Sequence, residues 1–163
     1  MKREEVLEKA LHSYEAYYDV KQGSVEEPFA AEAEFHSHDD AYFLVKSATI
    51  GEAESHEYVF FASVEALDEA LLKELDQIAW ERGISRVKPH SYHRNTDVTL
   101  VVIAGTVTAG AKKMAGSLKH YKNYRMSLQG FSHYHLIVVE SSTGELSCNR
   151  QGQNLKKIFH SIL

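Results

Sequence analysis

The chain of 163 residues has little of what marks a membrane, secreted or zinc-binding protein. Its longest apolar runs, near 100–105 and 136–139, are several-fold shorter than the roughly 20 residues that a membrane helix needs. The N-terminal residues lead into an acidic amphipathic segment, where a secretory signal would have an apolar stretch. The lone Cys148 cannot form an intramolecular disulfide, which agrees with a reducing compartment. We therefore expect a cytoplasmic protein that does not span a membrane.

Acidic residues are scarce in the second half of the chain. Residues 82–163 hold 3 Asp or Glu and 12 Lys or Arg, whereas residues 1–81 hold 20 and 6, so the halves carry formal charges of +9 and −14. An asymmetry of this size indicates charges that complement each other within the protein or between the subunits of a homo-oligomer, or a charged partner.

The composition, 44% hydrophobic and 10% aromatic, is that of one globular domain covering residues 1–163. Apolar periodicity predicts helices and strands in the order αβββαβαββα, hence an α+β or α/β fold with helices packed on a mixed sheet. Ser63 and Thr108 are expected to cap the second and third helices. The predicted helices cover residues 2–19, 63–82, 108–121 and 155–162, and the strands cover 29–36, 41–50, 58–62, 98–104, 124–128 and 133–140.

Residues 1–105 resemble the restriction-endonuclease-like nucleases in the order of their elements, αβββαβ. Those nucleases need an acidic residue and then a strand that carries Glu or Asp, any residue, and Lys. Lys46 occupies the lysine position of a predicted strand, but Leu44 stands where the carboxylate belongs. Asp19-Val20-Lys21 fits the pattern but follows the first helix, which is the wrong element. The sequence therefore lacks the catalytic motif of these nucleases in the strand where it is expected.

Two groups of residues could nevertheless serve metal-dependent chemistry. Glu52, Glu54, His56 and Glu57 lie at the entrance of an apolar strand, and clustered carboxylates can bind a divalent metal ion for phosphodiester hydrolysis. Histidines two residues apart on a strand share a face, so each pair could offer two imidazoles to one ion. The candidate ligands are His36, His38, Asp39, His133 and His135. The alternative is that these are surface residues of a hydrated sheet.

A basic and aromatic segment is the third candidate. Residues 98–139 contain no Asp or Glu, and cations interleaved with aromatic rings are what a nucleic-acid surface requires. The candidate anion-binding residues are Lys112, Lys113, Lys119, Tyr121, Lys122, Tyr124 and Arg125. The alternative is that this surface packs against the acidic half of the protein or of a second subunit.

Several longer phrases resemble an uncharacterised family of small prokaryotic proteins with no established function. They are Pro28-Phe29, Ala33–His36, Ala53–Phe60, Ser85–His90 and Asn149–Gly152. The resemblance implies a self-contained domain and no particular chemistry. The leading hypothesis is a non-catalytic domain that binds an anionic partner such as nucleic acid. The alternatives are a metal-dependent phosphodiesterase with a divalent metal as cofactor, and a structural homo-oligomer.

Overall fold

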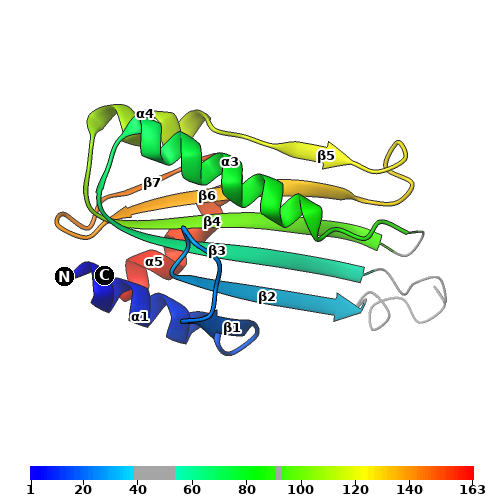
Figure 1. Ribbon diagram of the computed structural model, residues 1–163, viewed down its shortest axis with the longest axis horizontal. Coiled ribbons are helices and arrows are strands. Elements are labelled where there is room, and N and C mark those ends of the chain that lie inside the picture. The colour runs from blue at the N-terminus through cyan, green and yellow to red at the C-terminus, as the bar shows by residue number, and fades with distance from the viewer. Residues whose placement is uncertain (39–53, 91–92) are drawn as a thin grey trace.

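The computed structural model describes residues 1–38, 54–90 and 93–163 (Figure 1). The strand predicted at 41–50, and with it Lys46 and Leu44, lies outside these ranges. Within them, the elements form a mixed sheet with helices on both faces, which confirms the predicted α+β fold. None of the helices described is both long and apolar enough to cross a membrane.

The described strands form a seven-stranded sheet in the order β1-β2-β3-β4-β6-β5, with β7 paired to β6. Strands β3, β4 and β6 run parallel, and the other pairings are antiparallel. The strands are β1 (Asp19–Gln22), β2 (Ala31–His38), β3 (Glu54–Leu67), β4 (His93–Val107), β5 (Tyr121–Asn123), β6 (Phe131–Glu140) and β7 (Leu146–Cys148).

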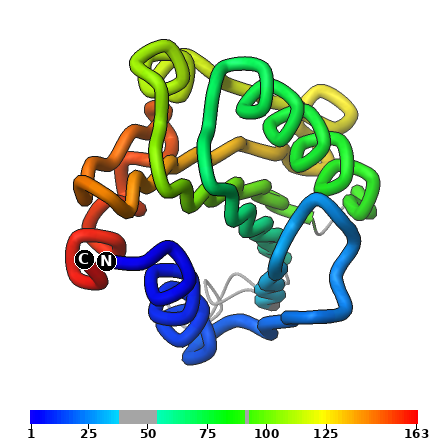
Figure 2. Tube along the Cα trace, turned by 60° about the vertical axis from the view of Figure 1, so that its left-hand side comes forward, coloured from blue at the N-terminus to red at the C-terminus, as the bar shows by residue number. Residues whose placement is uncertain are grey.

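Helices cover the two faces of the sheet separately (Figure 2). One face, which we call the α1 face, packs against α1 (Arg3–Tyr14), the 3-10 helix η1 (Gln151–Leu155) and α5 (Lys156–Ile162). The other, the α3 face, packs against α3 (Glu69–Ser85) and α4 (Ala109–Ser117). Because successive strand residues point to opposite faces, Phe61 belongs to the α1 face and Phe60 to the α3 face.

Strand β4 is central, as its apolar run predicts. It pairs with β3 on one side and β6 on the other, and residues Val98 and Leu100–Ala104 are fully buried. A strand covered on both faces has no polar side to alternate with, which explains the continuous apolar run. The predicted cap at Thr108 is also confirmed, since its hydroxyl accepts the backbone N–H of Ala111 at 3.1 Å.

Several predicted boundaries are wrong, and the third helix, predicted over residues 108–121, ends at Ser117. Helix α3 begins after Asp68 and not after Ser63, because residues up to Leu67 stay paired with β4 and the Asp68 carboxylate accepts the N–H of Leu71. The first helix ends at Tyr14, and β1 begins at Asp19, within the predicted helix. The strand predicted at 124–128 is a turn in which residues 125–127 have positive φ, and β5 precedes it.

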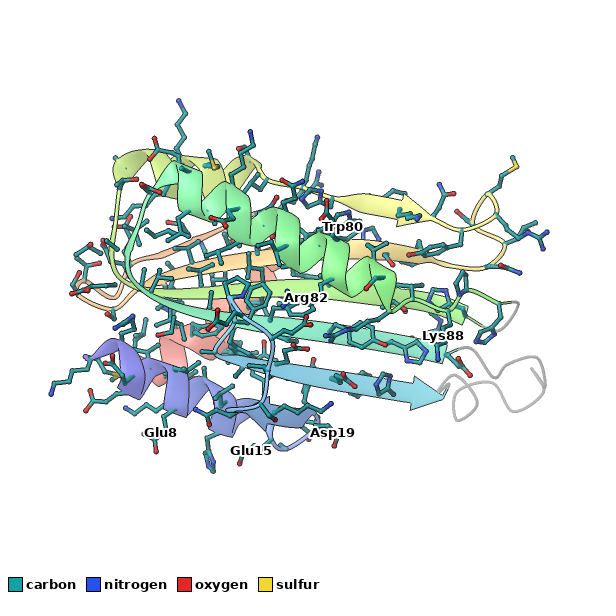
Figure 3. The ribbon with its side chains drawn as sticks, viewed as in Figure 1. Glu8, Glu15, Asp19, Trp80, Arg82 and Lys88 are labelled. Carbon is teal, nitrogen blue, oxygen red and sulfur yellow. The ribbon has the colours of Figure 1, made fainter. Side chains whose placement is uncertain are left out.

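Part of the charge asymmetry is neutralised inside the fold. Arg86 at the end of α3 lies 2.6 Å from Glu32 of β2, and Arg82 lies 3.4 Å from Glu26. Figure 3 shows three acidic residues of the first half, Glu8, Glu15 and Asp19, along α1 and the start of β1. Two arginines of the second half therefore pair with acids of the first, whereas Lys112 of the basic segment pairs with Glu140 and Glu145 of its own half.

Candidate functional site

A pocket of about 500 Å³ opens on the α1 face, between the sheet, the end of α1 and the C-terminal helices. We call it the tyrosine–carboxylate pocket. Its lining residues are Ser13, Tyr14, Tyr17, Tyr18, Glu57, Asp97, His135, Asn154, Leu155, Ile158 and Ser161. A larger hollow of about 1070 Å³ lies along the outside of α1, but its charged side chains are exposed. The tyrosine–carboxylate pocket is therefore where partly buried polar groups converge.

The parallel sheet brings the polar side chains of this pocket together. Glu57 of β3 is in register with Asp97 of β4, and Thr99 of β4 is in register with His135 of β6. All four positions share the side-chain parity of Val59, Val101 and Ile137, which belong to the apolar core of the α1 face. The pocket is thus the polar continuation of that core along three adjacent strands.

Glu57 is held by two hydroxyl groups. Its Oε1 accepts a hydrogen bond from the Tyr18 hydroxyl, and its Oε2 accepts one from Thr99 Oγ1 at 2.7 Å. It forms no ion pair with Lys or Arg among the residues that the structure describes. The carboxylate is therefore fixed in place without a fixed countercharge.

His135 is oriented from both of its ring nitrogens. Nδ1–H donates to the carbonyl oxygen of Gln151 at 2.7 Å, and Nε2 lies 3.5 Å from Asp97 Oδ2. Burial lowers the pKa of His135, but the hydrogen bond and charge of Asp97, with smaller contributions from Gln151 and Glu57, outweigh it and raise this pKa. The imidazolium form is thus favoured beside the carboxylate.

The turn that follows β7 supplies the Gln151 carbonyl and is held by Asn149. The buried Asn149 side chain accepts from the N–H groups of Leu136 and Gly152 and donates to the carbonyls of Leu118 and Tyr134. Gly152 leaves no room for a side chain, because a Cβ there would lie 2.3 Å from the Leu136 carbonyl oxygen. The phrase Asn149–Gly152 therefore sets the position of His135.

Two tyrosines form the wall opposite the sheet. The rings of Tyr14 and Tyr18 meet edge to face at 4.8 Å, and Tyr14 also meets Phe61 at 5.3 Å. Burial, and secondly the charge of Glu57, raises the pKa of both hydroxyl groups, so both remain protonated donors. Tyr18 donates to Glu57, but the buried hydroxyl of Tyr14 has no hydrogen-bond partner in the described structure, and neither has the buried Oδ1 of Asp97.

The α3 face carries a different polar group, a histidine cluster formed by His36, His56, His90 and His93. The Nδ1 atoms of His36 and His56 lie 2.7 Å apart, so one donates and the other accepts. The Nε2 atoms of His56 and His90 lie 3.4 and 2.8 Å from one oxygen of Glu54. His93 donates to the Gln129 carbonyl and accepts from Thr96. Protein groups therefore occupy several of the nitrogens that a ligand would use.

The metal candidates do not meet at one point. His36 lies on the α3 face, His135 lies on the α1 face, and His133 packs against the rings of Tyr121 and Phe131. Asp39 and the side chain of His38 lie outside the described residues. Within the described ranges, no three His, Cys, Asp or Glu side chains are arranged to bind one metal ion.

The sheet also separates the catalytic candidates. Glu54 and His56 lie together in the histidine cluster, whereas Glu57 faces the opposite side of the sheet. Glu52 lies outside the described residues. Glu54, His56 and Glu57 are close in the sequence, but their side chains therefore lie on two opposite surfaces of the sheet.

The anion-binding candidates fall into two groups. Five are exposed along α4, β5 and the turn that follows, namely Lys113, Lys119, Tyr121, Lys122 and Arg125. Lys112 instead contacts Glu140 at 3.0 Å and Glu145 at 2.6 Å, and Tyr124 is buried with its hydroxyl 3.0 Å from Ser132. These two residues stabilise the fold, and the other five, which we call the basic surface, are exposed.

Sequence reasoning missed most of the tyrosine–carboxylate pocket. The helix predicted over residues 2–19 includes Tyr14, Tyr17 and Tyr18, and no role was predicted for these tyrosines, for Asp97 or for Thr99. One signal was present, since Asp97 and Thr99 lie at the start of the apolar run with the two-residue spacing of one strand face. Their convergence with Glu57 and His135 depends on strand register, which the sequence does not display.

This protein is an α+β domain with a mixed sheet between two helical layers and a polar pocket on one face. Residues 2–161 match the family described as a domain of unknown function, DUF8052, and the chain belongs to that family. The expected membership of an uncharacterised family is thereby confirmed. No curated protein and no solved structure matches the chain.

Proposed function

We propose that the protein is a binding domain that takes up a small molecule in the tyrosine–carboxylate pocket. The observation that carries the proposal is the pairing of a pocket of about 500 Å³ with buried polar atoms, Tyr14 Oη and Asp97 Oδ1, that have no partner in the described structure. Buried polar groups are almost always hydrogen-bonded, and pockets of this size accommodate small organic ligands. A bound molecule would supply the missing partners.

A screen of small metabolites by thermal unfolding, followed by titration calorimetry, tests this proposal. The exposed Asn154 lines the pocket and the exposed Gln153 does not, so Asn154→Trp obstructs the pocket and Gln153→Trp is its matched control. We expect ligands that raise Tm in the wild type and in Gln153→Trp but not in Asn154→Trp. Ligands that bind Asn154→Trp equally well, or a screen without any ligand, would contradict the proposal.

The basic surface supports a second candidate function, binding of an anionic partner such as nucleic acid. Lys113, Lys119, Lys122 and Arg125 are exposed and form no ion pair within the described ranges, and Tyr121 exposes 54% of its surface beside them. Contacts between such cations and the phosphate groups of a nucleic acid are strongly salt-dependent, and an exposed ring can stack on a base.

Fluorescence anisotropy with labelled single-stranded DNA, duplex DNA and RNA measures this second function. We expect affinity that falls steeply between about 50 and 200 mM salt and is lost when Lys119, Lys122 and Arg125 are changed together to Ala. Unchanged affinity in the triple variant would exclude this surface as the site. Both functions are compatible with a cytoplasmic location, which the lone, buried Cys148 supports.

A further inference from the structure

The tyrosine–carboxylate pocket carries an excess of negative charge. Glu57 and Asp97 are neighbours on adjacent strands, and His135 is the only basic residue among the described side chains that line the pocket. If His135 is an imidazolium ion, it balances one carboxylate and leaves the other. A partly buried carboxylate without a countercharge is unfavourable, because it has lost water and gained no ion pair. A cation in the pocket would remove this cost.

The carboxylate oxygens of the residues that line the pocket specify what that cation must offer. Asp97 Oδ1 is buried without a partner and, as a carboxylate oxygen, can only accept. Both oxygens of Glu57 already accept hydroxyl groups, and Asp97 Oδ2 faces His135. Within the described residues, no three acidic, His or Cys side chains are arranged to hold a divalent metal ion. An ammonium group has three N–H donors, and each carboxylate oxygen can accept more than one hydrogen bond, so Asp97 Oδ1 and the remaining lone pairs of Glu57 suit it.

Tyr14 gives a second, independent indication of a ligand. This residue is only 4% exposed, lines the pocket, and has a hydroxyl group without a hydrogen-bond partner in the described structure. Because burial and the charge of Glu57 keep this hydroxyl protonated, it acts as a donor. The ligand should therefore also carry an acceptor, such as a hydroxyl or carbonyl oxygen, near its cationic group.

The remaining walls favour a ligand that is largely apolar. Tyr14, Tyr17 and Tyr18 present aromatic rings, and Leu155 and Ile158 present aliphatic side chains. Aromatic rings attract cations and also pack against apolar groups. The pocket thus has an acidic floor from the sheet and an apolar rim from α1 and the C-terminal helices.

We infer that the tyrosine–carboxylate pocket binds a small organic ammonium ion that carries an apolar group and a neighbouring hydrogen-bond acceptor. The ammonium group donates to Asp97 and lies near Glu57, the acceptor receives the hydroxyl of Tyr14, and the apolar group packs against Leu155 and Ile158. This inference rests on the proposed function, because it names the chemical class of the ligand for the same pocket.

Three compounds of one shape test the inference in the wild-type protein. They are 2-amino-1-phenylethanol, a cation at neutral pH, 1-phenyl-1,2-ethanediol, which is neutral, and mandelate, an anion. All three have a phenyl group and a hydroxyl, and they differ in the group beside it. We expect titration calorimetry to show that the cation binds at least about tenfold more tightly than the diol, with mandelate the weakest.

Variants locate the charge that is responsible. Glu57→Gln and Asp97→Asn should each weaken binding of the cation by about tenfold and leave the affinity of the diol almost unchanged. Glu65→Gln is the matched control, because Glu65 is an exposed carboxylate on the same strand as Glu57. The comparison of the three compounds in the wild type remains decisive if a variant fails to fold.

The outcomes separate the inference from the proposed function. If the diol or mandelate binds as tightly as the cation, and Asn154→Trp abolishes this binding, the pocket is a ligand site but the inferred charge is wrong. If Mg²⁺ or Ca²⁺ at millimolar concentration displaces the cation competitively, the site belongs to a metal ion and the inference fails. If the cation does not bind the wild type at all, the inference also fails, and the metabolite screen alone decides the proposed function.

Discussion

The two faces of the sheet differ in the partners of their buried carboxylates. On the α3 face, Glu32 pairs with Arg86 at 2.6 Å, and Arg86 also lies 3.8 Å from Glu34 and over the rings of Tyr58 and Phe60. On the α1 face, Glu57 and Asp97 have hydroxyl and imidazole partners but no Lys or Arg in the described part of the chain. The first arrangement is complete in itself, and the second is completed by a ligand.

The largest effect on stability is expected from substitution of Phe60 and Phe61, which are adjacent in the chain but lie on opposite faces of the sheet. Both are fully buried, so Phe60→Ala and Phe61→Ala should each lower the free energy of unfolding by about 4 kcal/mol, measured by urea titration. The milder Phe60→Leu and Phe61→Leu should differ in ligand binding. Only Phe61→Leu should weaken binding of 2-amino-1-phenylethanol, because Phe61 supports Tyr14 at 5.3 Å while Phe60 packs against Phe29.

An equal loss of affinity in the two leucine variants would mean that the pocket depends on the whole sheet and not on its own face. An affinity unchanged in both would mean that the position of Tyr14 does not control binding.

A smaller effect is expected when the ion pair of the α3 face is broken. Arg86→Ala leaves Glu32, which is 6% exposed, without its cation and should lower the free energy of unfolding by about 2 kcal/mol, less than for a fully buried pair because Arg86 is partly exposed. Lys88→Ala removes the same charge two residues later, where the side chain is exposed, and should cost at most about 0.5 kcal/mol.

Adding Glu32→Gln to Arg86→Ala should restore part of the lost stability, because the carboxylate left without its cation is then neutral. If Arg86→Ala were no more destabilising than Lys88→Ala, the charges of the α3 face would not be coupled, and the contrast between the faces would disappear.

The elements that the sequence predicts well are those with a local signal. The run 98–104 and the cap at Thr108 are of this kind, since burial on both faces and a side-chain hydrogen bond at a helix start each leave a mark within a few residues. The start of α3 could not be found in this way. Ser63 is a good capping residue, but the segment up to Leu67 is stabilised by pairing with a strand much later in the chain.

The pocket is less predictable than the fold for the same reason. Glu57, Asp97 and His135 come from three strands, and only the register between those strands places them together. The sequence phrase that contains Glu54, His56 and Glu57 indicates one acidic cluster, but the alternation of strand side chains sends Glu57 to the other face. Residues close in sequence were therefore separated, and residues distant in sequence were brought together.

The smallest expected effect is that of pH on the free energy of unfolding. Its sign is opposite for His56 on the α3 face and His135 on the α1 face. Burial lowers the pKa of His56, and the neighbouring His36 and His93 lower it further against the opposing effect of Glu54, whereas Asp97 holds the pKa of His135 above its ordinary value near 6.5. His56 therefore contributes stability above about pH 6.5 that is lost as the pH falls through its folded-state pKa. His135 contributes stability below about pH 6.5 that is lost as the pH rises through its folded-state pKa.

Urea unfolding at about pH 5 and about pH 8 measures both contributions. Compared with the wild type, His135→Asn should increase the gain in stability from the lower to the higher pH, because it removes a contribution made in acid. His56→Asn should decrease that gain, because it removes a penalty in acid. His160→Asn, at an exposed position of α5, should leave the gain unchanged. If His56→Asn and His135→Asn changed the gain in the same direction, protonation would not distinguish the two faces. The unbalanced negative charge of the α1 face would then need another explanation than a missing cation.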